Sequence, residues 1–177
     1  YCVAQGCSTA AACGIVGNAE RESTSNFDPG IINSIGAAGL FQWYQGRRDQ
    51  LEAEAKAAGK SWKDPDFQIQ FMWKEWSGSY YTALLKKKKG MTLDQFKKMS
   101  DPKEAARVFE AVFEVSGDTT DLRAKYAQKW YDKFSKMGGT ATSYMAFDDT
   151  PAMFSTFSNR TKSDAISAYA DNYMVYY

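Results

Sequence analysis

The strongest constraint on this chain is a short apolar helix near its start that ends beside a pair of glutamates. Ser8 or Thr9 can cap this helix, and the run of small and branched apolar residues predicts that it continues to about Arg21. Gly14 and Gly17 lower helix propensity, but they would let another helix lie close to this backbone. We therefore expect a central helix rather than a peripheral one.

The next segment has the composition of an irregular, Gly-rich loop. Residues 23–46 contain an Asp28-Pro29-Gly30 turn, Asn26 and Asn33, and the glycines Gly36 and Gly39 among short apolar runs. Within it, residues 36–43 read Gly-Ala-Ala-Gly-Leu-Phe-Gln-Trp, which combines glycines, aromatic rings and a side-chain amide. We predict a loop followed by a small hairpin or irregular ribbon at the rim of a cleft.

The rest of the first 139 residues is predicted to be helical. Amphipathic spacing predicts a helix from Arg47 to about Ala58, and start signals at Asp64, Thr92 and Asp101 predict three more. A last long helix is expected from about Asp121. The fold class is therefore α+β, mostly α, with a small hairpin region.

The composition changes after residue 139. Residues 140–177 are small and polar at first and then mix aromatic residues with Ser, Asn and Asp without a clean period. We expect one main domain over 1–139, and a linker or tail over 140–177 that leads to a further domain.

Charge and residue usage exclude several classes of function. The formal net charge is +1, so no overall field attracts nucleic acid, and no apolar run reaches the roughly 20 residues that cross a bilayer. The chain has no histidine, which excludes Ser-His and Cys-His nucleophiles. Carboxylates are thus the leading acid and base candidates, and we expect no metal and no cofactor.

The three cysteines all lie near the start of the chain. Cys2 could form a disulfide with Cys7 or with Cys13 in an exported protein, or the three could be small buried apolar residues. Zinc binding would need a fourth ligand and fits no common spacing.

An ordered set of motifs resembles the phage tail lysozyme family, whose lysozyme-like domains occur in phage tail proteins and in conjugation-associated peptidoglycan hydrolases. The resemblance covers roughly residues 8–137, and one departure is the longer loop at Thr24-Ser25-Asn26. The matching motifs are Gly14-Ile-Val-Gly-Asn18, Glu22-Ser23, Phe27-Asp-Pro29, Gly36-Ala-Ala-Gly-Leu-Phe-Gln-Trp43, Gly46-Arg-Arg48, Phe67-Gln-Ile-Gln-Phe71, Trp73-Lys-Glu75, Ala105-Ala-Arg-Val-Phe109, Phe113-Glu114, Arg123 and Tyr126-Ala127.

The resemblance implies that Glu22 is a general acid that protonates the glycosidic oxygen between N-acetylmuramic acid and N-acetylglucosamine. Desolvation against apolar walls can keep such a carboxyl protonated near neutral pH. Glu20 is a competitor, but two residues along a helix are about 200° of rotation, so both carboxylates cannot face one cleft. We prefer Glu22 and expect Glu20 to be a solvated residue at the helix end.

Several residues of the Gly-rich segment are expected to bind the glycan. Gln42 offers an amide for an N-acetyl or hydroxyl group, and aromatic faces can support pyranose rings. For Phe41 a place in the core is the open alternative, and for Arg47 a structural ion pair. The full set of expected binding residues is Ser23, Gly39, Phe41, Gln42, Trp43, Tyr44 and Arg47.

A second carboxylate would decide the type of reaction. An inverting hydrolase needs a base about 6.5–9.5 Å from the acid, and a retaining one needs a nucleophile about 5–5.5 Å away. Asp28 and Asp49 are the candidates. If neither takes part, the muramyl 6-hydroxyl attacks instead and the enzyme is a lytic transglycosylase.

The resemblance thus implies a muramidase acting on bacterial peptidoglycan outside the cytoplasm, as part of a virion tail or at the cell surface. Other phage tail or conjugation-machinery proteins are possible partners. The alternatives are a lytic transglycosylase, a module that binds glycan without cleaving it, and a purely structural tail protein.

Overall fold

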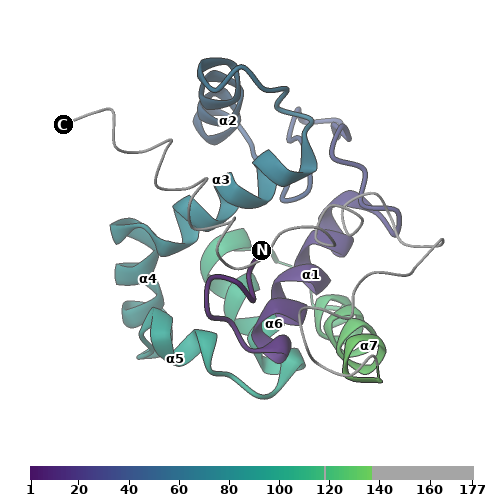
Figure 1. Ribbon diagram of the computed structural model, residues 1–177, viewed down its shortest axis with the longest axis vertical. Coiled ribbons are helices and arrows are strands. Elements are labelled where there is room, and N and C mark those ends of the chain that lie inside the picture. The colour runs from purple at the N-terminus through teal and green to yellow at the C-terminus, as the bar shows by residue number, and fades with distance from the viewer. Residues whose placement is uncertain (118, 137–177) are drawn as a thin grey trace. The chain divides into compact units, whose positions relative to one another are not determined.

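The computed structural model describes residues 1–117 and 119–136, and the predicted tail over 140–177 lies outside these residues. The described part is mostly helical, as predicted (Figure 1). Its helices are α1 (Thr9–Ser23), α2 (Gly46–Ala57), α3 (Pro65–Ser77), α4 (Ser79–Lys89), α5 (Leu93–Lys97), α6 (Pro102–Phe109), the π-helix η1 (Glu110–Glu114) and α7 (Leu122–Lys136).

Helix α1 is central, and its two glycines are the reason. It packs most extensively against α7 and α6. A Cβ placed on Gly14 would lie 2.8 Å from the backbone nitrogen of Ala106, and one on Gly17 would lie 2.4 Å from the carbonyl oxygen of Arg123. The prediction that these glycines admit close helices is confirmed, because each meets a different neighbouring backbone.

The predicted helix starts are also confirmed. The side chains of Ser8, Asp64 and Asp101 accept backbone N–H bonds at the starts of α1, α3 and α6, and proline follows both aspartates. Thr92 and Gln95 form a reciprocal capping box at α5. These local signals position the helices that surround α1.

The predicted hairpin is not confirmed. Between α1 and α2 the described chain contains only two isolated antiparallel bridges, Ile32 with Ala38 and Ala38 with Trp43. Tight turns at glycines with positive φ, including Gly36 and Gly39, replace regular strand pairing. The irregular ribbon, the other form considered for this segment, describes it better.

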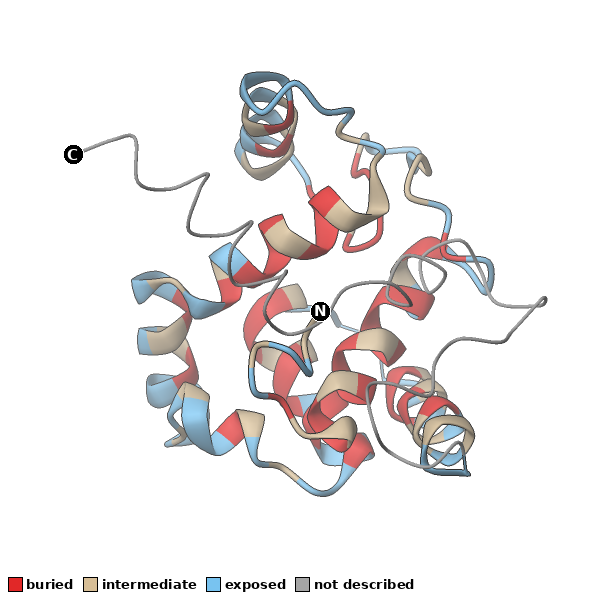
Figure 2. Cartoon of the chain, viewed as in Figure 1, coloured by how far each residue is buried: buried red, intermediate tan, exposed pale blue. Residues whose placement is uncertain are grey.

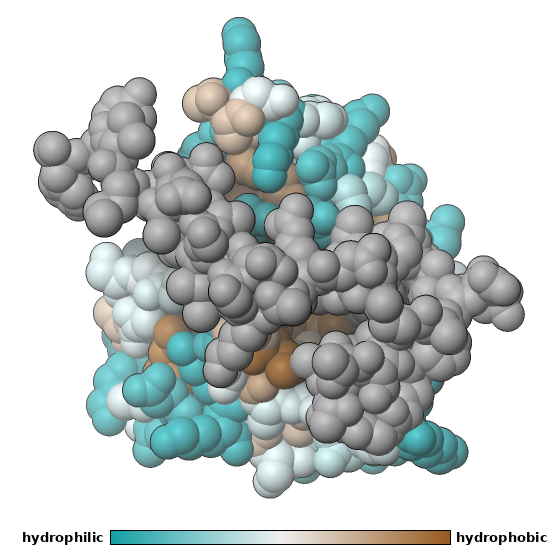
Figure 3. All heavy atoms as spheres, in the orientation of Figure 1, coloured by the Kyte–Doolittle hydropathy of each residue, from teal (hydrophilic) through white to brown (hydrophobic). Residues whose placement is uncertain are grey.

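An aromatic core joins the helices behind this ribbon. Phe109 and Phe113 stack with ring centroids 4.7 Å apart, and both contact Phe41 and Trp76. Buried residues lie along α1, α3 and α6, and α7 is buried on one side (Figure 2). On the face shown in Figure 3, hydrophilic side chains occupy much of the margin and apolar ones appear nearer the centre. The aromatic rings thus join the ribbon, α3, α6 and η1 in one core.

Candidate active site

Glu22 lies in the last turn of α1 and forms an ion pair with α7. Its Oε1 accepts from Nη2 of Arg123 at 2.7 Å, and the two side chains are 19% and 5% exposed. A carboxylate–guanidinium pair of this kind is strong because it is charge-assisted and largely shielded from water. Glu22 is therefore held in one position, with part of its side chain still open to solvent.

Arg123 connects Glu22 to the π-helix η1. Its Nε lies 3.2 Å from Oε1 of Glu110, and the charge of Arg123 also acts on Glu114 at the end of η1. Single π-helical turns are rare and often occur at functional sites. Here the wider turn places two glutamates within reach of one guanidinium.

A second ion pair, Arg47 with Glu75, also acts electrostatically on Glu114. Arg47 donates from Nε and Nη2 to the two carboxylate oxygens of Glu75, at 2.9 and 2.8 Å, and its guanidinium lies 4.6 Å from the centre of the Phe113 ring. The indole of Trp43 donates to the same carboxylate at 2.8 Å. The structural ion pair considered for Arg47 is thus present.

Glu20 does not lie where the sequence suggested. It is 4% exposed, and its carboxylate accepts from Trp130 Nε1 at 2.6 Å and from the ammonium of Lys129. The prediction of a solvated helix end was wrong, because α7 packs along α1 and covers this position. Glu20 joins α1 to α7 and is less exposed than Glu22.

Gln68 on α3 fixes the Gly-rich segment through hydrogen bonds of its side-chain amide. Its buried amide accepts from Leu40 N at 2.8 Å and donates to the carbonyls of Pro29 and Trp62. A Cβ on Gly39, where φ is +76°, would lie 2.7 Å from this amide. Gly39 therefore has a structural role that only glycine can fill.

Non-glycine residues with left-handed backbone lie next to these groups. Thr24 and Phe27 follow Glu22, Gln42 and Gln45 lie in the ribbon, and Val115 directly follows Glu114. Such conformations cost about 1–3 kcal/mol each and tend to occur at functional sites. The strain is thus concentrated around the Glu22 network and the ribbon.

Two of the expected sugar-stacking residues have no open face. Phe41 is 2% exposed and Trp43 is fully buried, and their rings contact each other and the core. Both rings belong to the core because the ribbon turns their side chains inward after Gly39. Ser23 is also buried, and its hydroxyl donates to the carbonyl of Ala19 at 2.6 Å.

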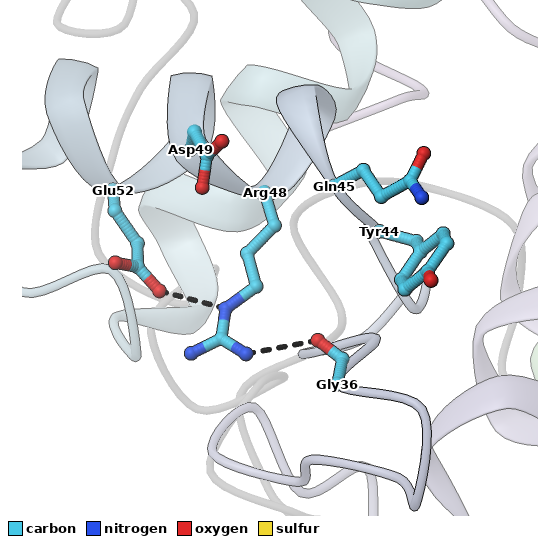
Figure 4. Close-up of a pocket in the computed structure, with 6 residues that line it drawn as sticks. All are labelled: Gly36, Tyr44, Gln45, Arg48, Asp49 and Glu52. Carbon is cyan, nitrogen blue, oxygen red and sulfur yellow. Dashed lines mark hydrogen bonds and ion pairs between the residues drawn. The ribbon is translucent and has the colours of Figure 1, made fainter.

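The remaining candidates in the ribbon are accessible. Tyr44 is 42% exposed, and Gln42 is half-buried with its amide donating to the carbonyl of Gly39 at 3.0 Å. Tyr44 and Asp49 line an open hollow of about 290 Å³ (Figure 4). Arg48 spans this hollow between Glu52 and the carbonyl of Gly36. The hollow is large enough for one ring-sized group but does not include Glu22.

The two candidate second carboxylates are both exposed. Asp28 accepts from the backbone N–H of Gly30 at 2.8 Å, which closes a turn after α1. Asp49 lies in the first turn of α2. Among the described residues, neither aspartate is part of the ion-pair network around Glu22.

A second hollow is lined in part by Arg47. It measures about 510 Å³, and its lining includes Lys74, Glu75 and the ring of Tyr80, which is 70% exposed. Sequence reasoning did not suggest this surface, because Tyr80 lies in no motif. The roles of Arg123, Glu110 and Glu114 as neighbours of Glu22 were also missed, although Glu114 and Arg123 occur in the quoted motifs.

The cysteines are free thiols in this structure. Cys7 and Cys13 are buried, and burial raises the pKa of each to about 12. They behave as small apolar residues, which was one of the open alternatives. Within the described residues, no helix has the length and apolar character needed to span a membrane.

Comparison with known proteins agrees with this picture. The family profile described as phage tail lysozyme matches residues 1–134, which include every helix up to α7 and all groups of the Glu22 network. A search of the curated proteins gives no match. Because the matched region spans most of the chain, the protein belongs to the phage tail lysozyme family, whose members are lysozyme-like peptidoglycan hydrolases.

Proposed function

We propose that the protein is a muramidase, which hydrolyses the β-1,4 bond between N-acetylmuramic acid and N-acetylglucosamine with Glu22 as the general acid. The observation that carries this proposal is the position of Glu22. It is a partly buried carboxyl at the end of the central helix, held by Arg123 and surrounded by strained backbone. A fixed, partly desolvated carboxyl suits proton transfer to a leaving oxygen.

The surroundings of Glu22 support acid chemistry better than simple binding. A module that only holds glycan needs hydrogen bonds and flat surfaces, and has no need of several partly buried carboxyls, which are costly to desolvate. Glycoside cleavage, in contrast, needs a proton donor and often a second carboxylate. The clustering of Glu22, Glu110 and Glu114 around one arginine therefore favours an enzyme.

We infer hydrolysis rather than intramolecular attack by the sugar. Asp28 and Asp49 are both exposed and belong to the segments on either side of the ribbon. An exposed carboxylate near the substrate is suited to orient a water molecule. The support is the accessibility of both carboxylates: Asp49 lies beside Tyr44 in an open hollow, although Glu22 does not line this hollow.

The product distinguishes the two reactions. Purified sacculi would be digested with the protein and the soluble fragments analysed by mass spectrometry. Hydrolysis is expected to give reducing N-acetylmuramic acid ends, whereas a lytic transglycosylase gives 1,6-anhydro ends that are lighter by one water. Predominant anhydro ends would remove both aspartates from the mechanism and leave Glu22 in place.

Gln42 provides a test of the binding surface. We expect Gln42→Ala to lower kcat/KM on glycan about three- to tenfold, because one neutral hydrogen bond contributes about 0.5–1.5 kcal/mol. The melting temperature should change little, since Gln42 is half-buried and its amide contacts only the Gly39 carbonyl among the described residues. Gln128→Ala, at a half-buried position on α7 where the amide donates to Asp132, is the control for both measurements.

A large drop in melting temperature with unchanged kcat/KM of the folded enzyme would contradict this role. Gln42 would then serve to hold the turn at Gly39 rather than the substrate.

A further inference from the structure

The ion pairs around Glu22 form one cluster with more acids than bases. Its charged members in the described residues are Glu22, Glu75, Glu110, Glu114, Arg47 and Arg123. Four carboxyls thus lie beside two guanidinium groups. The ion-paired side chains are only 5–32% exposed, and partly buried carboxyls do not readily hold two excess negative charges. The composition of the cluster indicates that it retains a proton.

Glu114 is the member best placed to carry that proton. It is the last residue of η1, and its Oε1 is fully buried with no hydrogen-bond partner among the described residues. Nε and Nη1 of Arg123 are likewise buried and have no hydrogen-bond partner there. One unmatched acceptor and two unmatched donors in one cluster are unusual in a folded protein and call for an explanation.

The electrostatic surroundings agree with a neutral Glu114. Burial raises the pKa of Glu114 well above its usual range, and the negative charges of Glu22 and Glu75 raise it further. Arg123 and Arg47 act in the opposite direction but do not outweigh burial. Tyr81 on α4 also faces Glu114, and burial raises its pKa to about 12, so it stays neutral over the working range.

We propose that Glu114 holds a proton for Glu22: the buried neutral carboxyl of Glu114 gives its proton to Glu22 and takes over the unmatched side of the Arg123 guanidinium. Glu114 is a positioning residue in this scheme, because it acts through Glu22 and does not touch the substrate. The inference rests on the proposed role of Glu22 as the general acid.

The transfer is balanced in atoms and charge. The O–H bond of Glu114 breaks, an O–H bond forms on the carboxylate of Glu22, and the negative charge moves from Glu22 to Glu114. Arg123 remains positive throughout and exchanges one carboxylate partner for another. Glu22 can then deliver its proton to the glycosidic oxygen without leaving an unpaired guanidinium.

The scheme predicts a particular pH dependence. A lone glutamate titrates at about pH 4.3 and would supply little acid at neutral pH. Two coupled carboxyls that share one proton keep it until the solution pH reaches the second macroscopic pKa of the pair. The proton that Glu114 passes to Glu22 therefore stays available at higher pH. Removing Glu114 as the partner should therefore lower the pH at which activity is lost on the alkaline side of the profile.

The test compares pH profiles of kcat/KM on solubilised peptidoglycan strands, from about pH 4 to about pH 9, for the wild-type chain and Glu114→Gln. The variant keeps the shape of the neutral carboxyl but cannot donate its proton. We expect its alkaline limb to move to lower pH by about one unit or more. At the acid end of the range, where solvent supplies protons without help from a partner, activity should stay close to that of the wild type.

Glu110→Gln is the matched comparison. Glu110 lies on the same π-helix and also contacts Arg123, but its carboxylate has a hydrogen-bond partner in the hydroxyl of Ser116. Its substitution is expected to leave the alkaline limb where it is in the wild type. Equal shifts for both glutamines would show a general effect of charge on Arg123 and would overturn the assignment to Glu114.

The outcomes separate this inference from the proposed function. If Glu22→Gln is inactive and Glu114→Gln has the wild-type profile, the proton-sharing scheme is wrong and the acid role of Glu22 stands. If Glu22→Gln retains full activity, the proposed function itself fails. Loss of activity at every pH in a folded Glu114→Gln protein would also overturn the scheme.

A measurement on the wild-type chain keeps the test independent of how the variant folds. The side-chain carboxyl carbons of Glu22 and Glu114 would be followed by ¹³C NMR during a pH titration. Coupled carboxyls give two-step curves for both signals. Two independent single-step curves would refute the shared proton.

Discussion

Replacing Glu22 with glutamine is expected to abolish peptidoglycan cleavage. Because the amide removes the charge that pairs with the buried Arg123 guanidinium, stability should fall, while the protein that remains folded should still bind glycan. The amide keeps the shape of the side chain but cannot deliver a proton to the glycosidic oxygen. General acid catalysis contributes about 10²–10⁴-fold, so kcat should fall at least that far. The measurement is release of soluble fragments from sacculi, with circular dichroism and binding to sacculi as checks on the fold and on the substrate surface.

Glu20→Gln is the control, because Glu20 lies two residues earlier on α1. Its carboxylate joins Lys129 and Trp130 and has no described contact with Arg123. The substitution is expected to lower stability, since it leaves the Lys129 charge without its partner, and to preserve cleavage by the folded protein. An active Glu22→Gln with an inactive Glu20→Gln would reverse the assignment of the acid.

The difference between these two glutamates shows what the sequence could not predict. Helical rotation separates their side chains, but the burial of Glu20 depends on Lys129 and Trp130, more than a hundred residues away. Nothing local to α1 indicates that α7 covers this position. Exposure at a helix end is decided by the packing of distant elements, which periodicity in one segment does not reveal.

Helix starts were predictable because their signals are local. Asp64 and Asp101 each precede a proline and cap the helix that follows, so three or four residues contain the whole argument. The close helix contacts of Gly14 and Gly17 followed from the absence of a side chain. The π-helix η1 has no such signal, and with it the grouping of Glu110 and Glu114 around Arg123 was missed.

The ribbon shows the limits of reading function from residue type. Phe41, Gln42 and Trp43 are neighbours in one motif, and Tyr44 follows it. All four were candidates for binding the glycan, with a place in the core as the open alternative for Phe41. The left-handed backbone at Gln42 and the support of Gln68 beneath Gly39 turn Phe41 and Trp43 into the core. Only Gln42 and Tyr44 remain accessible, so we base the binding proposal on these two.

The largest expected effect on stability comes from Gly17→Ala. The added methyl would lie 2.4 Å from the carbonyl oxygen of Arg123 and 2.6 Å from the nitrogen of Ala127. Both are backbone atoms of α7, which cannot rotate away as a flexible side chain would. The cost is expected at the upper end of overpacking, about 3 kcal/mol or more, which exceeds the gain of about 1 kcal/mol in helix propensity. The net loss of about 2 kcal/mol or more should lower the melting temperature by about 4–8 °C or more, as measured by calorimetry.

Gly46→Ala separates this steric effect from the general effect of replacing a helical glycine. Gly46 begins α2, and a Cβ there would meet no atom within 4 Å. Its substitution should leave stability unchanged or raise it by up to about 1 kcal/mol. Because α7 also carries Arg123, displacing it in Gly17→Ala should disturb the ion pair with Glu22 and lower cleavage by the protein that remains folded. A Gly17→Ala protein that melts at the wild-type temperature and cleaves sacculi normally would show that α1 and α7 do not pack as closely as described here.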